Sequence, residues 1–186
     1  MVKVGFICEG FTEEIILKSK DFQRILRVLN IESVGIFNVE GNSNLLPHNI
    51  LKYRNQLIKK SASVIIILTD LDEDECITKT KLRITEQHNQ IIIIAVKQIE
   101  SWFLADSILL TKLLGEPFEF NFPENEEIPF KTLRQLLIKF KGRGVPEKLP
   151  MALKMLNNGF SIQNAANHPN CPSAKYFLTK LQSIEI

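Results

Sequence analysis

Three aspartates, Asp70, Asp72 and Asp74, alternate with other residues and begin one residue after the apolar run Val64–Leu68. In an extended chain, residues two apart point to the same side, so the three carboxylates could converge just beyond a strand. Like charges this close repel one another unless a positive charge lies among them. A hard divalent cation, which prefers oxygen ligands, is the simplest such charge. The spacing therefore predicts a metal site.

The elements that would position these carboxylates form a repeating pattern of strands and helices. Short apolar runs predict four buried strands, at Val2–Cys8, Ser33–Val39, Val64–Leu68 and Gln90–Val96. Apolar residues at helical spacing predict helices after each strand, at 12–29, 45–60, 75–88 and 100–114. This alternation is typical of α/β proteins with a doubly wound, mainly parallel four-stranded sheet.

The topology of such a sheet would bring Glu9 to the aspartates. Doubly wound sheets bind ligands outside the carboxyl ends of the strands, where the strand order reverses. In the simplest winding, the first and third strands are neighbours at that point. Glu9, which follows the first strand, would then lie beside Asp70 and Asp72, although it is far from them in sequence.

Further acidic residues follow the first and fourth strands. Gly10 would allow a tight turn from strand to helix, and Glu13 would then flank the start of that helix. Glu100 falls on the same edge of the predicted sheet and could complete an acidic pocket. Each glutamate also has a plainer interpretation, because a carboxylate in the first turn of a helix complements the helix dipole.

Together these segments resemble the Toprim domain of topoisomerases, primases and OLD-type nucleases. That family has a glutamate after its first strand and a DxD or DxDxD sequence after its third. The matching segments here are EGFTE at 9–13 and DLDED at 70–74. Small stand-alone prokaryotic Toprim-like proteins add E-x-W-x-L-A-D, matched by 100–106, and a late P-S pair, matched by Pro172-Ser173. The core of the resemblance spans residues 1–110.

The resemblance implies phosphoryl-transfer chemistry on nucleic acid, either DNA or RNA, that depends on Mg²⁺ or Mn²⁺. One or two such ions would neutralise a scissile phosphate, lower the pKa of a bound water and stabilise the leaving oxygen. The residues at matching positions are Glu9, Asp70 and Asp72 as catalytic residues and metal ligands, Asp74 as a further metal ligand, and Glu13 and Glu100 as supporting residues.

The sequence departs from the topoisomerases in one respect. Strand passage needs a catalytic tyrosine, and no companion domain that would supply one is evident. The two tyrosines, Tyr53 and Tyr176, fall at helical positions that packing explains better. Hydrolysis of the phosphodiester, as in OLD-type nucleases, is therefore the expected reaction.

The last third of the chain changes character. We expect a Toprim-like α/β domain over 1–114, a linker or surface loop over 115–129 and a helical appendage over 130–186. Basic residues outnumber acidic ones between 131 and 154, which would suit a phosphate backbone. The candidate nucleic-acid contacts are Lys139, Lys141, Arg143 and Lys148. A solvated helix face is the alternative interpretation of the same charges.

The overall composition is that of an ordinary globular protein. Its 186 residues, 45% hydrophobic and 24% charged, suit one domain with a small appendage. A net charge of +2 does not by itself imply a nucleic-acid or membrane partner. The three cysteines lack the spacing of a disulfide framework, and the apolar runs are far shorter than the roughly 20 residues of a membrane span. We therefore expect a reduced, cytoplasmic protein.

Two other functions are compatible with these observations. The stand-alone Toprim-like proteins are often encoded beside ATPases, so the chain could act with an ATPase in phage defence or nucleic-acid processing. It could also dock on an ATPase as a non-catalytic interaction subunit. A weaker alternative is a phosphohydrolase of a small metabolite, because the same acidic pocket would serve that reaction.

Overall fold

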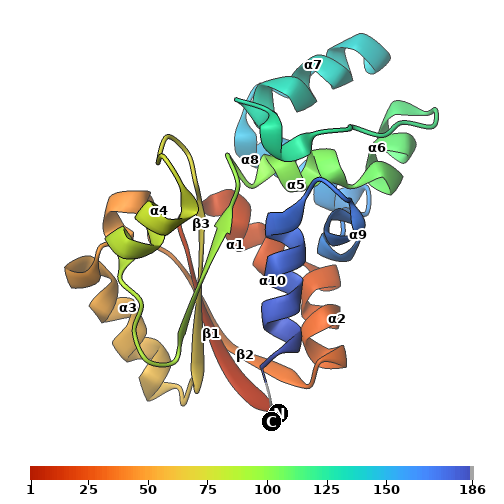
Figure 1. Cartoon of the computed structure of the whole chain (residues 1–186). Coiled ribbons are helices and arrows are strands. Elements are labelled where there is room, and N and C mark those ends of the chain that lie inside the picture. The colour runs from red at the N-terminus through yellow and green to blue at the C-terminus, as the bar shows by residue number, and fades with distance from the viewer. Residues whose placement is uncertain (185–186) are drawn as a thin grey trace. The chain divides into compact units, whose positions relative to one another are not determined.

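The structure, a computed structural model that describes residues 1–184, contains a four-stranded parallel sheet (Figure 1). Its strands are β1 (Val2–Cys8), β2 (Ile31–Asn38), β3 (Val64–Asp70) and β4 (Gln90–Ala95). Their order is β2-β1-β3-β4, so β1 and β3 are hydrogen-bonded neighbours. The expected α/β fold class is confirmed, and so is the expected neighbouring of the first and third strands.

The described chain divides into two compact units by its contacts. Residues 1–94 and 179–184 form one, which we call the sheet unit, and residues 95–178 form the other, which we call the helical unit. The division falls before Glu100, so residues 100–114, expected to belong to the α/β domain, lie in the helical unit.

The helices of the sheet unit follow its strands in sequence. They are α1 (Phe11–Lys18), α2 (Lys20–Val28), the 3-10 turn η1 (Asn42–Leu45), α3 (Pro47–Lys59) and α4 (Ile77–Ile84). The single helix expected over 12–29 is wrong, because the chain is extended at Ser19. The Ser19 hydroxyl accepts a hydrogen bond of 3.2 Å from the backbone N–H of Phe22, and this N-cap starts a second helix.

Alternate side chains of the strands contact opposite helical layers. Phe6 of β1 packs edge-on against Phe22 of α2, with ring centroids 5.6 Å apart. Its neighbour Ile7 belongs to a buried cluster that includes Leu57 of α3 and Ile84 of α4. Figure 1 shows α3 and α4 on one side of the sheet and α2 on the other. Burial on both faces explains why β1, β3 and β4 are mainly apolar, whereas β2 is mostly half-buried and carries more polar residues.

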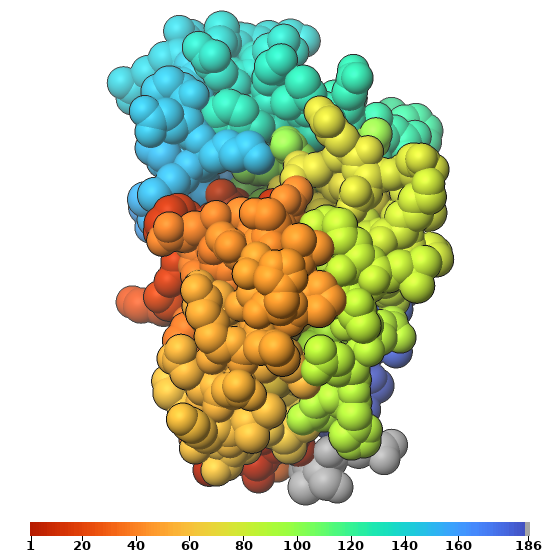
Figure 2. Space-filling view, turned by 90° about the vertical axis from the view of Figure 1, so that its left-hand side faces the viewer, coloured from red at the N-terminus to blue at the C-terminus, as the bar shows by residue number. Residues whose placement is uncertain are grey.

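Hydrogen bonds join helix α3 to the start of strand β4. Figure 2 shows the segment around α3 beside the segment that contains α4. The buried guanidinium of Arg54, on α3, donates hydrogen bonds to the side chain of Gln90 and, at 3.5 Å, to that of Asn89. These bonds hold the start of β4 against the helix.

The helical unit is built around α5. Its elements are α5 (Glu100–Ala105), α6 (Ser107–Leu114), the 3-10 turn η2 (Pro123–Asn125), α7 (Pro129–Lys141), α8 (Lys148–Asn157), α9 (Ile162–Asn167) and the first part of α10 (Pro172–Gln182). Every residue of α5 is buried, and α5 packs against α6, α7, α9 and η2. None of the described helices is long and apolar enough to cross a membrane.

The single helix expected over 100–114 is also wrong. It breaks at Asp106, whose side chain accepts a hydrogen bond of 2.9 Å from the backbone N–H of Leu109 at the start of α6. Asp106 also accepts bonds from the backbone of Ser161 and the side chain of Asn164, so it ties α6 to α9. Burial raises the pKa of the Asp106 carboxyl despite these bonds.

A close approach between β1 and α3 can be tested at Gly5. A Cβ atom at Gly5 would lie 2.7 Å from the Cδ atoms of Leu57, which is fully buried. Since overpacking of this kind costs about 1–3 kcal/mol, we expect Gly5→Ala to lower the free energy of unfolding by that amount in urea titrations. The double variant Gly5→Ala/Leu57→Ala should lose less free energy of unfolding than the losses of the two single variants added together. An unchanged Gly5→Ala variant would contradict this packing.

Candidate active site at the ends of β1 and β3

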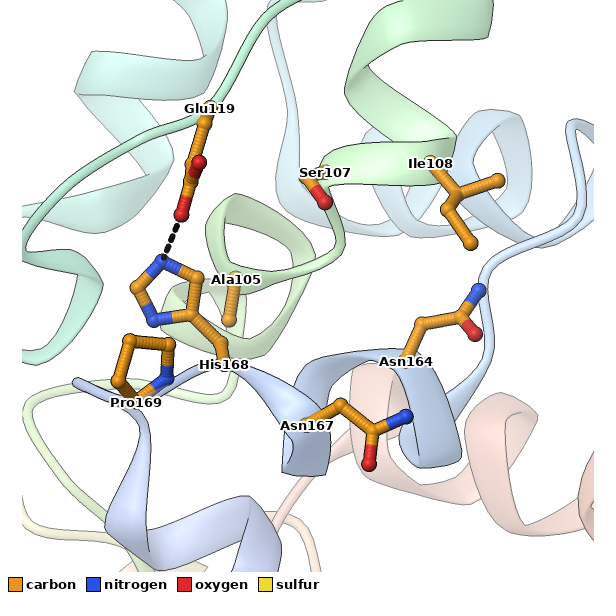
Figure 3. A pocket seen from close by; sticks show the side chains of 8 residues that line it. All are labelled: Ala105, Ser107, Ile108, Glu119, Asn164, Asn167, His168 and Pro169. Atoms are coloured by element: carbon orange, nitrogen blue, oxygen red, sulfur yellow. Dashed lines mark ion pairs between the residues drawn. The ribbon is translucent and has the colours of Figure 1, made fainter.

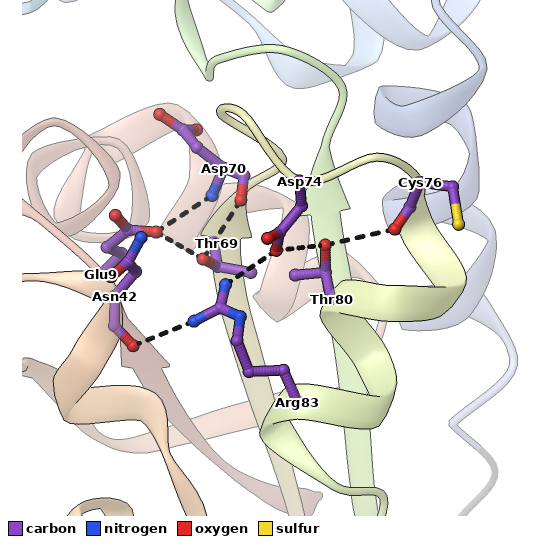
Figure 4. A network of polar contacts seen from close by, with 8 residues as sticks. All are labelled: Glu9, Asn42, Thr69, Asp70, Asp74, Cys76, Thr80 and Arg83. Carbon is purple, nitrogen blue, oxygen red and sulfur yellow. Dashed lines mark hydrogen bonds and ion pairs between the residues drawn. The ribbon is translucent and has the colours of Figure 1, made fainter.

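The carboxyl ends of β1 and β3 bring Glu9 and Asp70 together. Cys8 and Leu68 are partners in the parallel pairing, and the backbone N–H of Glu9 donates to the Leu68 carbonyl at 3.1 Å. The backbone N–H of Asp70 donates in turn to Oε2 of Glu9 at 3.3 Å. The hydroxyl of Thr69, which is fully buried, donates to the same oxygen (Figure 4). The Glu9 side chain and the Asp70 backbone therefore meet at one point of the sheet edge.

The environment of Glu9 disfavours its negative charge. Burial raises the pKa of the Glu9 carboxyl, and the charge of Asp72 raises it further. The hydrogen bonds from Thr69 and Asp70 act in the opposite direction. Both of those bonds end on Oε2, so within the described chain Oε1 of Glu9 is available to a ligand.

Asp72 lies in a turn rather than in an extended chain. The backbone of Asp72 has φ of 47°, in the left-handed region that aspartate tolerates better than most residues. The turn is closed by a bond of 3.0 Å from the N–H of Asp74 to the Leu71 carbonyl. The expectation that three alternating aspartates would converge as in a strand is therefore wrong, because β3 ends at Asp70.

Asp74 points to a different set of partners (Figure 4). Its Oδ2 accepts hydrogen bonds from the Thr80 hydroxyl at 2.8 Å and from Nη2 of Arg83 at 3.0 Å. These contacts lower the pKa of the Asp74 carboxyl, the bond from Thr80 most. Arg83 also donates through Nη1 to the Asn42 carbonyl at 3.4 Å. The positive charge that the sequence pattern called for is thus partly supplied by α4.

Glu13 is close to the same sheet edge. It is buried in the first turn of α1, and a Cβ atom at Gly10 would lie 3.1 Å from its Oε2. The glutamate therefore folds back over the glycine that follows Glu9. This position agrees both with a supporting role at the site and with the plainer dipole interpretation.

The cysteines near this edge differ sharply in exposure. Cys76 is exposed just before α4, and its carbonyl accepts a long bond of 3.4 Å from Thr80. Cys8 is buried at the end of β1, where burial and the nearby Glu13 charge raise its pKa. Cys171, in the helical unit, is also buried.

The remaining candidate residues belong to the helical unit. Glu100 is fully buried in α5, with its carboxylate 3.8 Å from the ammonium of Lys148. The other candidate nucleic-acid contacts are exposed at the end of α7 and in the loop after it, and they are Lys139, Lys141 and Arg143. Gly142 ends α7 in the left-handed conformation, so the loop leaves the helix abruptly.

A buried polar network joins the two late segments of the family resemblance. The indole N–H of Trp102 donates to the Ser173 hydroxyl at 2.7 Å, and that hydroxyl donates to Glu124 at 2.5 Å. Glu124 also accepts from the backbone N–H of Ser173 at 2.9 Å. Trp102 stacks on Phe177 of α10, with centroids 5.7 Å apart. Trp102 is therefore a fully buried core residue.

The helical unit also contains a small pocket of about 150 Å³ (Figure 3). His168 lines it, and its Nδ1 accepts a bond of 3.1 Å from the N–H of Asn170. The ring proton therefore resides on Nε2, which lies 3.7 Å from the carboxylate of Glu119. Other lining residues include Ser107 and Asn164.

Sequence reasoning missed Thr69, Arg83 and Glu124. Thr69 had a usable signal, because it directly precedes Asp70 at the end of a buried strand. Arg83 and Glu124 had none, since their partners come from elements whose packing no local pattern encodes. The comparisons with known proteins add nothing to these assignments. No family model, curated protein or solved structure matches the chain.

We use the term acidic edge for Glu9, Asp70, Asp72 and Asp74, at and just beyond the carboxyl ends of β1 and β3. Their oxygen atoms are the type of ligand that a hard divalent ion prefers. Glu9, Asp70 and Asp72 offer carboxylate oxygens, and Mg²⁺ is usually held by one or two carboxylates with waters and substrate phosphates. Among residues 1–184, however, no group of three or more His, Cys, Asp and Glu side chains is arranged to hold a metal ion. Metal binding by these residues stays a prediction.

The raised pKa of Glu9 gives a pH-dependent stability. Protonated Glu9 favours the folded chain below its unfolded pKa, and this stability is lost as pH rises through the raised folded pKa. We therefore expect Glu9→Gln to melt at a higher temperature than wild type at neutral pH, with the difference vanishing toward acid pH. The matched variant Glu73→Gln, at an exposed site, should show no such difference. A Glu9→Gln variant less stable than wild type at neutral pH would contradict the assignment.

The network at Ser173 can be tested by removing its hydroxyl. Ser173→Ala leaves the Trp102 indole without its acceptor and removes the hydroxyl donor from the Glu124 carboxylate. Unsatisfied buried groups cost about 1–3 kcal/mol, so unfolding monitored by tryptophan fluorescence should show a loss of that size. Ser183→Ala is the control, because that exposed hydroxyl bonds only the Lys180 carbonyl. Equal stability of the two variants would argue against the network.

Proposed function

We propose that the protein hydrolyses phosphodiester bonds of nucleic acid, DNA or RNA, in a reaction that depends on Mg²⁺ or Mn²⁺. The observation that carries the proposal is the bond between the Asp70 N–H and Glu9, because it joins the two strand ends that the resemblance to Toprim domains singles out. The raised pKa of Glu9 adds support, since perturbed carboxyls cluster at functional sites.

The residues that would hold the ion are Glu9, Asp70 and Asp72, with Asp74 as a further ligand. A divalent ion there would supply charge neutralisation for the scissile phosphate and a water of lowered pKa. The Thr69 hydroxyl and the Asp70 N–H fix Oε2 of Glu9, so the carboxylate is held in one orientation. Oε1 could then accept a proton from the attacking water, and burial, which raises the pKa of the Glu9 carboxyl, makes this carboxylate a stronger base.

The exposed cations of the helical unit would hold the substrate backbone. Lys139, Lys141 and Arg143 are open to solvent, which favours contacts with phosphates. Lys148 serves the buried Glu100 as an ion-pair partner, so we assign it a structural role in addition. Such contacts position nucleic acid without selecting a sequence.

The decisive experiment is cleavage of end-labelled DNA and RNA strands by the purified chain with Mg²⁺ or Mn²⁺. We expect cleavage that EDTA abolishes, and a Glu9→Gln variant slower by about 10²–10⁴-fold, the usual contribution of a positioned acid or base. Glu75→Gln is the matched control: it makes the same change at an exposed carboxylate paired with Lys79, and it should keep full activity.

Other outcomes would overturn the proposal in distinguishable ways. Turnover of a phosphomonoester without cleavage of DNA or RNA would favour the metabolite phosphohydrolase. If the wild type is inactive alone, the assay is repeated with an ATPase encoded beside it. Full function of that complex with the Glu9→Gln variant would favour the non-catalytic interaction subunit.

A further inference from the structure

A cation from α4 lies inside the acidic edge of the sheet unit (Figure 4). The Arg83 guanidinium contacts Asp74 through Nη2 at 3.0 Å and the Asn42 carbonyl through Nη1 at 3.4 Å. Its Nε is buried and has no hydrogen-bond partner within the described residues. Burial raises the pKa of the Glu9 carboxyl, and the positive charge of Arg83 opposes this rise. The guanidinium therefore acts on the candidate catalytic carboxylate as well as on Asp74.

The ion pair between Arg83 and Asp74 is weak enough for another anion to replace Asp74. The two side chains are 27% and 32% exposed, and ion pairs that water reaches contribute little to stability. Asp74 keeps a second partner, the Thr80 hydroxyl, if Arg83 leaves. Arg83 would keep its charge, and the N–H groups of its planar guanidinium could then donate two parallel hydrogen bonds to another anion.

We propose that Arg83 is the phosphate-binding residue of this site and changes partners when substrate binds. In the ligand-free chain it neutralises Asp74; with substrate it pairs with a phosphate oxygen of the nucleic acid and leaves Asp74 to the divalent ion. Arginine suits this role because its fork matches phosphate geometry. The inference rests on the proposed function and adds to it the residue that recognises the substrate's charge.

The exchange makes opposite demands on the two ligands. A fixed positive charge at the site repels a divalent ion and attracts a phosphate. Removing it should therefore tighten ion binding and weaken phosphate binding. A residue that merely holds the turn in place would weaken both ligands when it is removed, so the two roles give different results.

The experiment measures both ligands on the same variants of the full chain. Mn²⁺ is titrated by calorimetry, and a short phosphorothioate single strand is titrated by fluorescence anisotropy in Ca²⁺. We expect Arg83→Gln to bind Mn²⁺ about fivefold more tightly, from the removed repulsion across a water-filled edge, and the oligonucleotide about tenfold more weakly.

Two further variants separate charge from geometry. Arg83→Lys keeps the charge without the fork, so it should bind Mn²⁺ as wild type does and the oligonucleotide more weakly. Lys79→Gln is the matched control, because Lys79 lies one turn earlier on α4, is 58% exposed and pairs with Glu75. It should change either affinity by less than about twofold. Thermal melts establish that each variant is folded. If Arg83→Gln is not folded, the test uses the oligonucleotide affinity of Arg83→Lys in its place.

The outcomes that overturn the inference differ from those that overturn the function. Wild-type binding of both ligands, with Arg83→Gln unchanged or weakened toward both, rejects the role of Arg83 and leaves the proposed function intact. Wild-type chain that binds neither Mn²⁺ nor the oligonucleotide rejects both. Opposite shifts in Arg83→Gln, absent from Lys79→Gln, would establish the exchange.

Discussion

The parallel pairing of β1 with β3 is the constraint on which the candidate site depends. It fixes Cys8 against Leu68, so the next residues of both strands emerge at the same edge of the sheet. Glu9 and Asp70 meet there because of backbone hydrogen bonds, not because their side chains attract each other. The sheet thereby holds a carboxylate in a partly buried place that disfavours its charge.

The strands of this sheet could be predicted well, and its helices less well. Short, β-branched apolar runs favour buried strands by their length, and β1 has the bounds that its sequence indicates. The two helix breaks were missed because apolar periodicity continues across Ser19 and Asp106. Either residue is also acceptable within a helix, and only its side-chain bond to the following turn makes it a cap. α9 was missed because six residues are too few for a periodic pattern.

The meeting of Glu9 with Asp70 could be predicted from topology, whereas the fate of Asp74 could not. Alternation predicts a common side only while the chain stays extended, and the turn at Asp72 ends that condition. What Asp74 then contacts depends on where α4 packs. The same limit applies to Glu124, in a segment expected to be a linker or surface loop. It is buried because its partner Ser173, 49 residues later, is brought to it by tertiary packing.

The uneven burial of the cysteines has a practical consequence. Two of the three thiols are enclosed, and their raised pKa values keep them in the unreactive protonated form. Cys76 alone is open to solvent, at the foot of α4 and two residues beyond Asp74. The chain therefore has a single accessible thiol for labelling with a maleimide-linked spin label or fluorophore. A probe attached there would report movement of the acidic turn without any prior removal of cysteines.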